Sequence, residues 1–234
     1  MLILFDIDAT LITTNRAGLY AMLDAGRELV GPRFSIEGID TAGRLDPVII
    51  HDMLLASGIT PTEELHAAFR DAYARHLPRH LTARGGGALP GTTQLVSALA
   101  RSEDVTLGLL TGNFETTGRH KLRFCGFDDA QFPVAAWGDD SPNRLPHARP
   151  ERHDLPPVAL ARAARLREVQ PARSLIIGDT PHDVSCAKAH GLRVLGVATG
   201  GTSRDELLAC GADHAVDDLS RTPDVLDWIR TTLS

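Results

Sequence analysis

The sequence contains few of the residues that mark several common protein classes. Only Cys125, Cys186 and Cys210 among its 234 residues are cysteines, and no two of them form a CxxC pair. An odd number of isolated thiols argues against a disulfide framework and against a zinc site. Such thiols are typical of small core side chains in a reducing compartment. We therefore expect a cytoplasmic protein.

The chain also lacks long apolar runs, runs of like charge and an excess of basic residues. No apolar stretch approaches the length of a membrane span, and the N-terminus does not resemble a signal peptide. A formal net charge of -6 argues against nucleic-acid binding and against anionic membrane surfaces. We expect neither partner, and the sequence carries no signal for an oligomeric state. With 43% hydrophobic residues, the chain can bury one large core or a core with an inserted smaller one.

From residue 86 onward, short apolar segments alternate with segments of helical periodicity. The expected strands are 105–110, 133–137, 174–177, 193–197 and 213–216, and the expected helices are 92–101, 115–124, 155–169, 184–190, 204–209 and 223–233. Strands that alternate with helices predict a parallel sheet covered on both faces. The apolar segment Leu2 to Phe5 reads as another buried strand of that sheet.

Residues 15–85 instead show only helical patterns, with helices expected at 17–30, 47–56 and 61–77. The run Gly85-Gly86-Gly87 reads as a flexible linker at the end of this block. We therefore predict an α/β fold: a doubly wound parallel-sheet (Rossmann-like) core with an inserted small helical cap domain. The core would comprise residues 1–14 and 86–234, and the cap residues 15–85, placed as a lid beside the end of the first strand.

Two acids, Asp6 and Asp8, directly follow the first strand. Ligands bind at the carboxyl ends of strands in open α/β sheets, and two carboxylates at such a place need a partner. A divalent metal with oxygen ligands is the simplest partner. A solvated polar turn is an equally good interpretation of this stretch on its own.

Two further strand ends carry polar groups of the same kind. Thr111-Gly112-Asn113 can donate hydrogen bonds to an anion, and Asp179 and Asp183 are one helical turn apart. Each alone is explained as well by a turn or a helix cap. Together they would place up to four carboxylates on one edge, where they repel one another unless a cation lies among them. An oxygen-only set without histidine or cysteine favours Mg²⁺.

An anionic substrate also needs a cationic group near this edge. Arg152, just before the helix expected at 155–169, is our choice because a guanidinium grips phosphate with two hydrogen bonds. On the residues alone, a solvated surface arginine is about as good an interpretation.

These motifs resemble those of the haloacid dehalogenase-like hydrolase superfamily, and the resemblance covers nearly the whole chain. It is most specific at residues 5–11 and 177–183, with the second motif at 110–113. The tail from 191 to 213 is similar to that of phosphoglycolate-phosphatase-like members with a helical cap after the first motif. Ala9 stands where glycine is common, and Arg152 where lysine is usual. Lys121 competes with Arg152 for the third motif, although it reads as a surface residue of its helix.

The resemblance implies roles for the acids at this edge. Asp6 would attack phosphorus and form an aspartyl-phosphate, and Asp8 would act first as general acid and then as general base. The resemblance implies a Mg²⁺ ion held by Asp6, the main-chain carbonyl of Asp8 and Asp179. Asp183 would orient the groups around the metal.

The resemblance also implies the groups that bind substrate. The phosphate would be held by Thr111, Gly112, Asn113 and Arg152. In the cap, Gly43 and Arg44 would face the site, with Arg44 either gripping a substrate anion or pairing with Asp46.

Several chemistries share this scaffold, and individual residues separate them. Dehalogenation needs neither Asp8 nor the Asp179 motif, and phosphonatase chemistry needs a cap lysine, which residues 15–85 lack. The sequence therefore predicts a Mg²⁺-dependent phosphatase acting on a small phosphorylated metabolite. A phosphomutase on a phosphorylated sugar and a catalytically inactive binding protein remain as alternatives.

Overall fold

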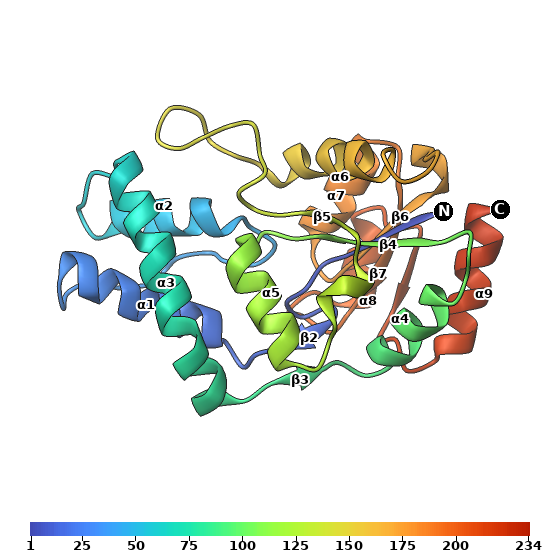
Figure 1. The fold of residues 1–234 in the computed structure, drawn as a ribbon, viewed down its shortest axis with the longest axis horizontal. Coiled ribbons are helices and arrows are strands. Elements are labelled where there is room, and N and C mark those ends of the chain that lie inside the picture. Colours follow the sequence, from blue (N-terminus) through green and yellow to red (C-terminus); the bar gives the residue numbers. More distant parts are fainter.

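The computed structural model describes residues 1–234 and is built around a parallel sheet of six strands with helices on both faces (Figure 1). Its strand order is β5-β4-β1-β6-β7-β8. The strands are β1 (Leu2–Phe5), β4 (Thr106–Leu110), β5 (Val134–Ala136), β6 (Ser174–Gly178), β7 (Arg193–Val197) and β8 (His214–Val216). Strand β1 pairs with β4 on one side and with β6 on the other. The predicted α/β class is confirmed.

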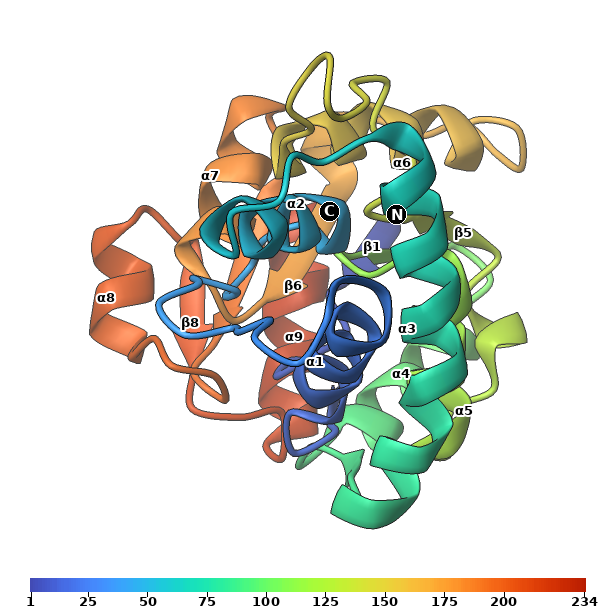
Figure 2. The ribbon, with the colours of Figure 1, turned by 90° about the vertical axis from the view of Figure 1, so that its left-hand side faces the viewer.

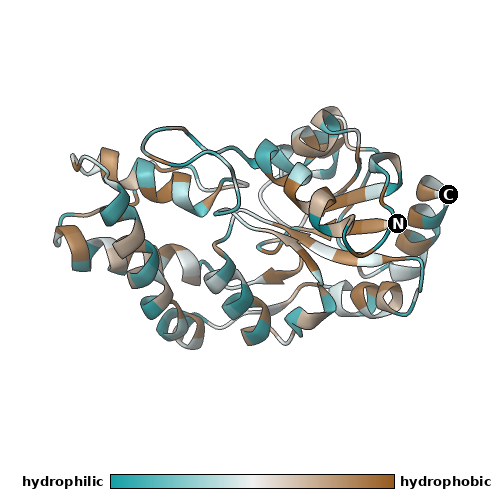
Figure 3. Cartoon of the chain, turned by 45° about the horizontal axis from the view of Figure 1, so that its top comes forward, coloured by the Kyte–Doolittle hydropathy of each residue, from teal (hydrophilic) through white to brown (hydrophobic).

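Alternate side chains of β1 enter two separate hydrophobic cores, as the two-residue period of a strand requires. Ile3 and Phe5 pack with apolar residues of α4 (Thr92–Ala100), α5 (Glu115–Phe124) and α9 (Thr222–Leu233). Leu2 and Leu4 pack on the opposite face, with residues of α6, α7 and α8. Those helices span Leu155–Ala163, Pro181–Ala189 and Arg204–Ala209. In Figure 3 the hydrophobic colour accordingly runs along the strands of the sheet.

The helical region inserted after β1 has a hydrophobic core of its own. It consists of α1 (Ala17–Val30), α2 (Asp46–Ala56) and α3 (Glu63–Arg84). Its buried cluster includes Phe69 and Tyr73 of α3 packed with residues of α1 and α2. The three helices lie together at one end of the molecule, in front of the sheet in Figure 2.

The two chain segments that join the helical region to the sheet pair with each other. Ile12 and Thr13 form strand β2, which runs antiparallel to Gly87–Ala88, strand β3. Beside this pair, the Asn15 side chain donates to the Arg84 carbonyl at 3.0 Å, and Arg84 Nε donates to the Asn15 carbonyl at 2.7 Å. The expectation of a free glycine linker is therefore wrong at Gly87, because its backbone pairs with β2.

Two helices end away from their predicted positions. Helix α3 continues through Pro78 to Arg84, because Leu77 and Leu81 are buried in the core of the helical region. Helix α6 ends at Ala163 rather than near residue 169. Leu166, just beyond this end, is largely exposed and has no apolar surface to cover. No helix combines the length and the apolar character that a membrane crossing requires.

Candidate active site

The carboxyl ends of three adjacent strands bring distant polar residues together. Strands β4, β1 and β6 are neighbours in the sheet, so the segments that follow them lie side by side. Asp6, Thr111 and Asp179 come from these three segments and line one cavity of about 650 Å³. Residues of α1, α2 and α3 line the same cavity from the other side. This volume is in the usual range for a small-molecule site.

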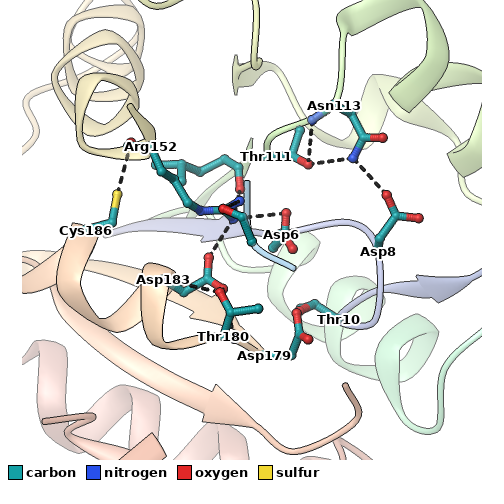
Figure 4. Close-up of polar contacts among 12 residues, drawn as sticks. Asp6, Asp8, Thr10, Thr111, Asn113, Arg152, Asp179, Thr180, Asp183 and Cys186 are labelled. Carbon is teal, nitrogen blue, oxygen red and sulfur yellow. Dashed lines mark hydrogen bonds and ion pairs between the residues drawn. The ribbon is translucent and has the colours of Figure 1, made fainter. Parts of the chain in front are cut away.

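Three buried acids form a tight cluster at this edge (Figure 4). Asp6, Asp179 and Asp183 each offer a carboxylate oxygen within 4.8 Å of the others. Burial, reinforced by the charge of Asp183, raises the pKa of Asp6 to about 6 even though Arg152 opposes the shift. Burial together with the charges of Asp6 and Asp183 raises the pKa of Asp179 to about 8. The cluster therefore holds more negative charge than its surroundings stabilise.

Arg152 is buried within this cluster rather than solvated at the surface. Its Nη2 contacts Asp183 Oδ1 at 2.6 Å and Asp6 Oδ1 at 3.1 Å, and also donates to the Leu110 carbonyl at 3.2 Å. Burial alone would lower the pKa of Arg152, but the charges of Asp183 and Asp6 raise it instead. The short 3₁₀ turn at Arg152–Asp154, ahead of α6, places the guanidinium here.

The donor set of the cluster fits a hard divalent cation. Three carboxylates face one guanidinium, and the contact of Asp179 within the chain is a single hydrogen bond from the Thr10 hydroxyl at 3.2 Å. Asp183 is held more firmly, since its Oδ2 accepts from the N–H and the hydroxyl of Thr180. Oxygen ligands with an excess of negative charge suit Mg²⁺. Asp6 and Asp179 are therefore the side chains best placed to bind such an ion.

Asp8 points away from the three clustered acids and into a second polar network. Its Oδ2 accepts from Lys121 Nζ at 2.6 Å and from Asn113 Nδ2 at 2.9 Å. Asn113 Nδ2 also donates to the Thr111 hydroxyl at 2.8 Å. The Asp8 side chain remains 42% exposed, and Asp8 lines the cavity. It is therefore fixed at one oxygen but still accessible to a ligand.

The interpretation of Lys121 as a surface helix residue is wrong, because its side chain is only 6% exposed. Its ammonium group lies between Asp8 Oδ2 and Asn113 Oδ1, each at 2.6 Å. Burial alone would lower the pKa of Lys121, but the charge of Asp8 leads the effects that raise it. Helical spacing carried a usable signal, since Thr117 and Lys121 lie one turn apart in α5, shortly after Asn113.

Ala9, the departure from glycine in the first motif, adopts the left-handed conformation with φ of 58°. For a residue with a Cβ atom this region costs roughly 1–2 kcal/mol. The surrounding contacts hold it, including a hydrogen bond from the Thr199 hydroxyl to the Ala9 carbonyl.

The segment before α2 packs directly on the strand edge. The Gly43 carbonyl accepts from Arg152 Nη1 at 3.3 Å. The Asp46 N–H donates to the Gly112 carbonyl at 2.7 Å, and a Cβ atom at Gly112 would lie 2.1 Å from the Arg44 carbonyl oxygen. Only glycine allows this approach, so position 112 fixes how closely the helical region sits on the edge.

Arg44 does not pair with Asp46, so that alternative is wrong. Arg44 Nη2 binds Asp52 at 2.6 Å, and Arg149 holds the same carboxylate at 2.9 Å. Asp46 is buried, and its Oδ2 accepts from the Phe114 N–H at 3.1 Å. Burial raises the pKa of Asp46 to about 7.

Several cavity or cluster residues were not singled out from the sequence for this site. Thr180 is one of them: it forms a capping box with Asp183, which the pattern Thr-x-x-Asp at the start of α7 could have indicated. Asp46 was considered only as a partner for Arg44. Tyr73 carries no such signal, because a buried aromatic residue at helical spacing reads as core.

Comparisons with known proteins agree with this geometry. The family model described as HAD-hydrolase-like matches residues 154–222. A phosphoglycolate phosphatase of Cereibacter sphaeroides is 30% identical over 195 residues, which cover 82% of this chain and 82% of that protein. A phosphoglycolate phosphatase of Rhodospirillum rubrum is 32% identical over 144 residues, covering 62% of this chain and 55% of the relative. The crystal structure of a hydrolase from Pseudomonas syringae superposes with a TM-score of 0.72 at 21% identity, covering 97% of this chain and 98% of that one.

Proposed function

This chain belongs to the haloacid dehalogenase-like hydrolases and is a phosphatase of that superfamily, and from this premise we propose its mechanism. The enzyme hydrolyses a small phosphorylated metabolite, depends on Mg²⁺ and works through an aspartyl-phosphate on Asp6. The observation that carries the proposal is the cluster of Asp6, Asp179 and Asp183 on one strand edge, with Asp8 held beside it.

The two acids of the first motif divide the chemistry. A carboxylate oxygen of Asp6 attacks phosphorus and the ester P–O bond breaks, while Asp8 gives a proton to the leaving alcohol oxygen. Asp8 then removes a proton from water, and that water attacks the phosphorus of the aspartyl-phosphate. Inorganic phosphate leaves and Asp6 is restored. The partial exposure of Asp8 to the cavity supports this assignment, since the acid must reach both the alcohol and the water.

The transferring phosphoryl group lies, in this proposal, between Thr111, Gly112, Asn113 and Arg152. The Thr111 hydroxyl and the Gly112 backbone are at the end of β4, and Arg152 contacts the nucleophile Asp6 directly. The Asn113 amide already donates to Asp8 and to the Thr111 hydroxyl. Asn113 therefore contributes by holding these two groups in register with each other.

The metal would be held by the carboxylates of Asp6 and Asp179 and by the main-chain carbonyl of Asp8. Asp183 supports this set indirectly, because Thr180 and Arg152 fix its orientation. When bound, Mg²⁺ offsets the repulsion between the Asp6 carboxylate and the phosphate dianion.

We further propose that residues 15–85 act as a cap domain over a core of residues 1–14 and 86–234. The separate hydrophobic cluster of α1, α2 and α3 supports this division. So does the paired connection of β2 with β3, where the chain enters and leaves the helical region. In the cap, Gly43 faces the phosphate site. Arg44 is paired with Asp52, so its main role in this proposal is to stabilise the loop rather than to bind a ligand.

The test is phosphate release from p-nitrophenyl phosphate with Mg²⁺ by the Asp6→Asn variant. Asparagine keeps the shape of the side chain but cannot act as the nucleophile, so we expect the rate to fall by about 10³-fold or more. Asp71→Asn is the matched control, because Asp71 is a largely exposed acid of α3. Activity retained by Asp6→Asn would refute the mechanism.

A further inference from the structure

The inner part of the cavity contains a buried hydroxyl without a partner. Tyr73 of α3 lines the cavity and is fully buried, yet its hydroxyl makes no hydrogen bond of good geometry within the chain, although the Thr117 side chain lies beside it. The other buried side-chain atom without a partner is Nε of Arg152, at the strand edge where the phosphate is proposed to bind, hereafter the phosphate edge. An unsatisfied buried hydroxyl costs roughly 1–3 kcal/mol, so its retention calls for an explanation. A ligand group in the cavity would supply the missing partner.

Lys121 presents a second donor to the same space. Its ammonium group uses two of its three N–H bonds on Asp8 and Asn113 and keeps one for a ligand. A Cβ atom at Gly18 of α1 would lie 3.0 Å from the Tyr73 hydroxyl oxygen and 3.1 Å from Lys121 Nζ. The two donors therefore converge on the space that Gly18 leaves open.

Asp46 adds a carboxyl group to this part of the cavity. Its Oδ2 accepts from the Phe114 N–H, and the residue lines the cavity. Leu19, Met22 and Ile49 supply an apolar wall. The inner cavity thus offers two donors and one carboxyl group beside apolar surface.

The position of this set relative to Asp8 gives it a role. The proposed general acid must meet the oxygen of the leaving alcohol, and Lys121 is bonded to that acid at 2.6 Å. The alcohol part of the substrate would therefore extend toward Lys121, Tyr73 and Asp46.

We propose that Tyr73, Lys121 and Asp46 form the leaving-group subsite and that it takes a small, neutral, hydroxyl-bearing alcohol, so that the substrate is a polyol phosphate. This inference rests on the proposed phosphatase function. A hydroxyl accepts from Tyr73 or Lys121 and donates to Asp46. A carboxylate at the same place can only accept, and it would bring a further negative charge beside Asp46.

The charges around the subsite favour the neutral group. Lys121 is held by Asp8 and by Asn113, each at 2.6 Å, so a second anion would compete with Asp8 for its ammonium group. Among the other cavity cations outside the phosphate edge, Arg44 is paired with Asp52 and Arg16 is exposed. A carboxylate on the leaving alcohol would therefore lie beside Asp46 and would have to share Lys121, the buried cation of the subsite, with Asp8.

The experiment compares kcat/KM with Mg²⁺ for glycerol 3-phosphate, phosphoglycolate and p-nitrophenyl phosphate. We expect glycerol 3-phosphate to exceed phosphoglycolate by about 10-fold or more. Tyr73→Phe removes only the hydroxyl, so the glycerol 3-phosphate to p-nitrophenyl phosphate ratio should fall by about 10-fold, with KM rising. Tyr20→Phe is the matched control: Tyr20 is the only other tyrosine, its ring stacks on Arg84 outside the cavity, and no ratio should change.

A second variant tests the same space by filling it. Gly18→Ala places a methyl group against both donors at a helical position that favours alanine, so it too should lower the glycerol 3-phosphate ratio. Preference for phosphoglycolate, or a ratio that both variants leave unchanged, would overturn the subsite. Loss of the proposed function would look different: the wild type would turn over none of the three esters, or Asp6→Asn would remain active.

Discussion

Individual charges at this site are set by their neighbours more than by their residue type. Five acids, Asp6, Asp8, Asp46, Asp179 and Asp183, lie in or beside the cavity, yet two buried cations divide them into separate groups. Arg152 serves Asp6 and Asp183, and Lys121 serves Asp8. Asp46 and Asp179 have no cation in contact, and burial raises the pKa of both. For these two carboxyl groups, the cost of burying the charged form is therefore not offset by a cation in contact.

Asp46 should make the stability of the protein depend on pH. Its pKa is about 7 in the folded state against about 3.9 in an unfolded chain, so folding favours the protonated form. That contribution is fully present below pH ~4 and is lost as pH rises through about 7, by up to a few kcal/mol. Asp46→Asn cannot lose a proton and keeps an acceptor for the Phe114 N–H.

Urea unfolding of both proteins at pH 5 and pH 8 measures the effect. The free energy of unfolding of Asp46→Asn relative to wild type should rise between the two pH values. A difference that is the same at both would show that Asp46 is ionised throughout. Because both proteins share every other titrating group, the comparison isolates position 46.

How far single residues could be predicted from the sequence depended on what they touch. Asp6 and Asp179 were recognisable because they end apolar strands, and parallel strands end on a common edge. Lys121 was misread because its partner Asp8 is more than a hundred residues away along the chain. Tyr73 was not found at all, since only the packed structure reveals that its hydroxyl has no partner.

At the scale of elements, periodicity fixed the order of strands and helices but not every end. Helix α1 and helix α5 have the predicted bounds, and α1 ends at the predicted Gly31. Helix α3 is longer than predicted because buried contacts override the proline inside it. Pairing of β2 with β3 was not predictable, since two-residue strands carry no period.

The segment before α2 makes a close contact with the strand edge beside the cavity. Gly112→Ala would place a methyl group 2.1 Å from the Arg44 carbonyl oxygen, so the segment before α2 must move away. We expect kcat/KM to fall at least about 10-fold and stability to fall by about 1–3 kcal/mol. Steady-state kinetics and urea unfolding measure both effects.

Gly87→Ala is the control for that substitution. A Cβ atom at Gly87 would have no other atom within 4 Å, and the residue does not adopt a positive φ. Alanine should therefore change little there. Equal behaviour of the two variants would mean that the close approach at Gly112 does not hold the helical region in place.

At the scale of the whole molecule, the metal joins segments that are far apart in sequence. Asp6 follows β1 and Asp179 follows β6, so a cation bound by both stabilises the folded chain and not the unfolded one. At Mg²⁺ a hundredfold above its dissociation constant, the gain is about 2.7 kcal/mol, which corresponds to roughly 5–10 °C in Tm.

Thermal unfolding with EDTA and with Mg²⁺ checks this prediction. Asp179→Asn should lose most of the Mg²⁺-dependent rise in Tm, whereas Asp217→Asn, at a largely exposed acid, should keep it. A full rise in the Asp179→Asn variant would place the metal elsewhere.

The central claim, that Asp6 is the phosphorylated nucleophile, can be tested by trapping it. Borohydride reduces an acyl phosphate to an alcohol, so treating the enzyme during turnover of p-nitrophenyl phosphate with Mg²⁺ should convert Asp6 to homoserine. Mass spectrometry of the N-terminal peptide measures the conversion. The account predicts homoserine at position 6 only when both ester and Mg²⁺ are present. Phosphate release with Asp6 unmodified, or modification of a different carboxylate, would contradict it.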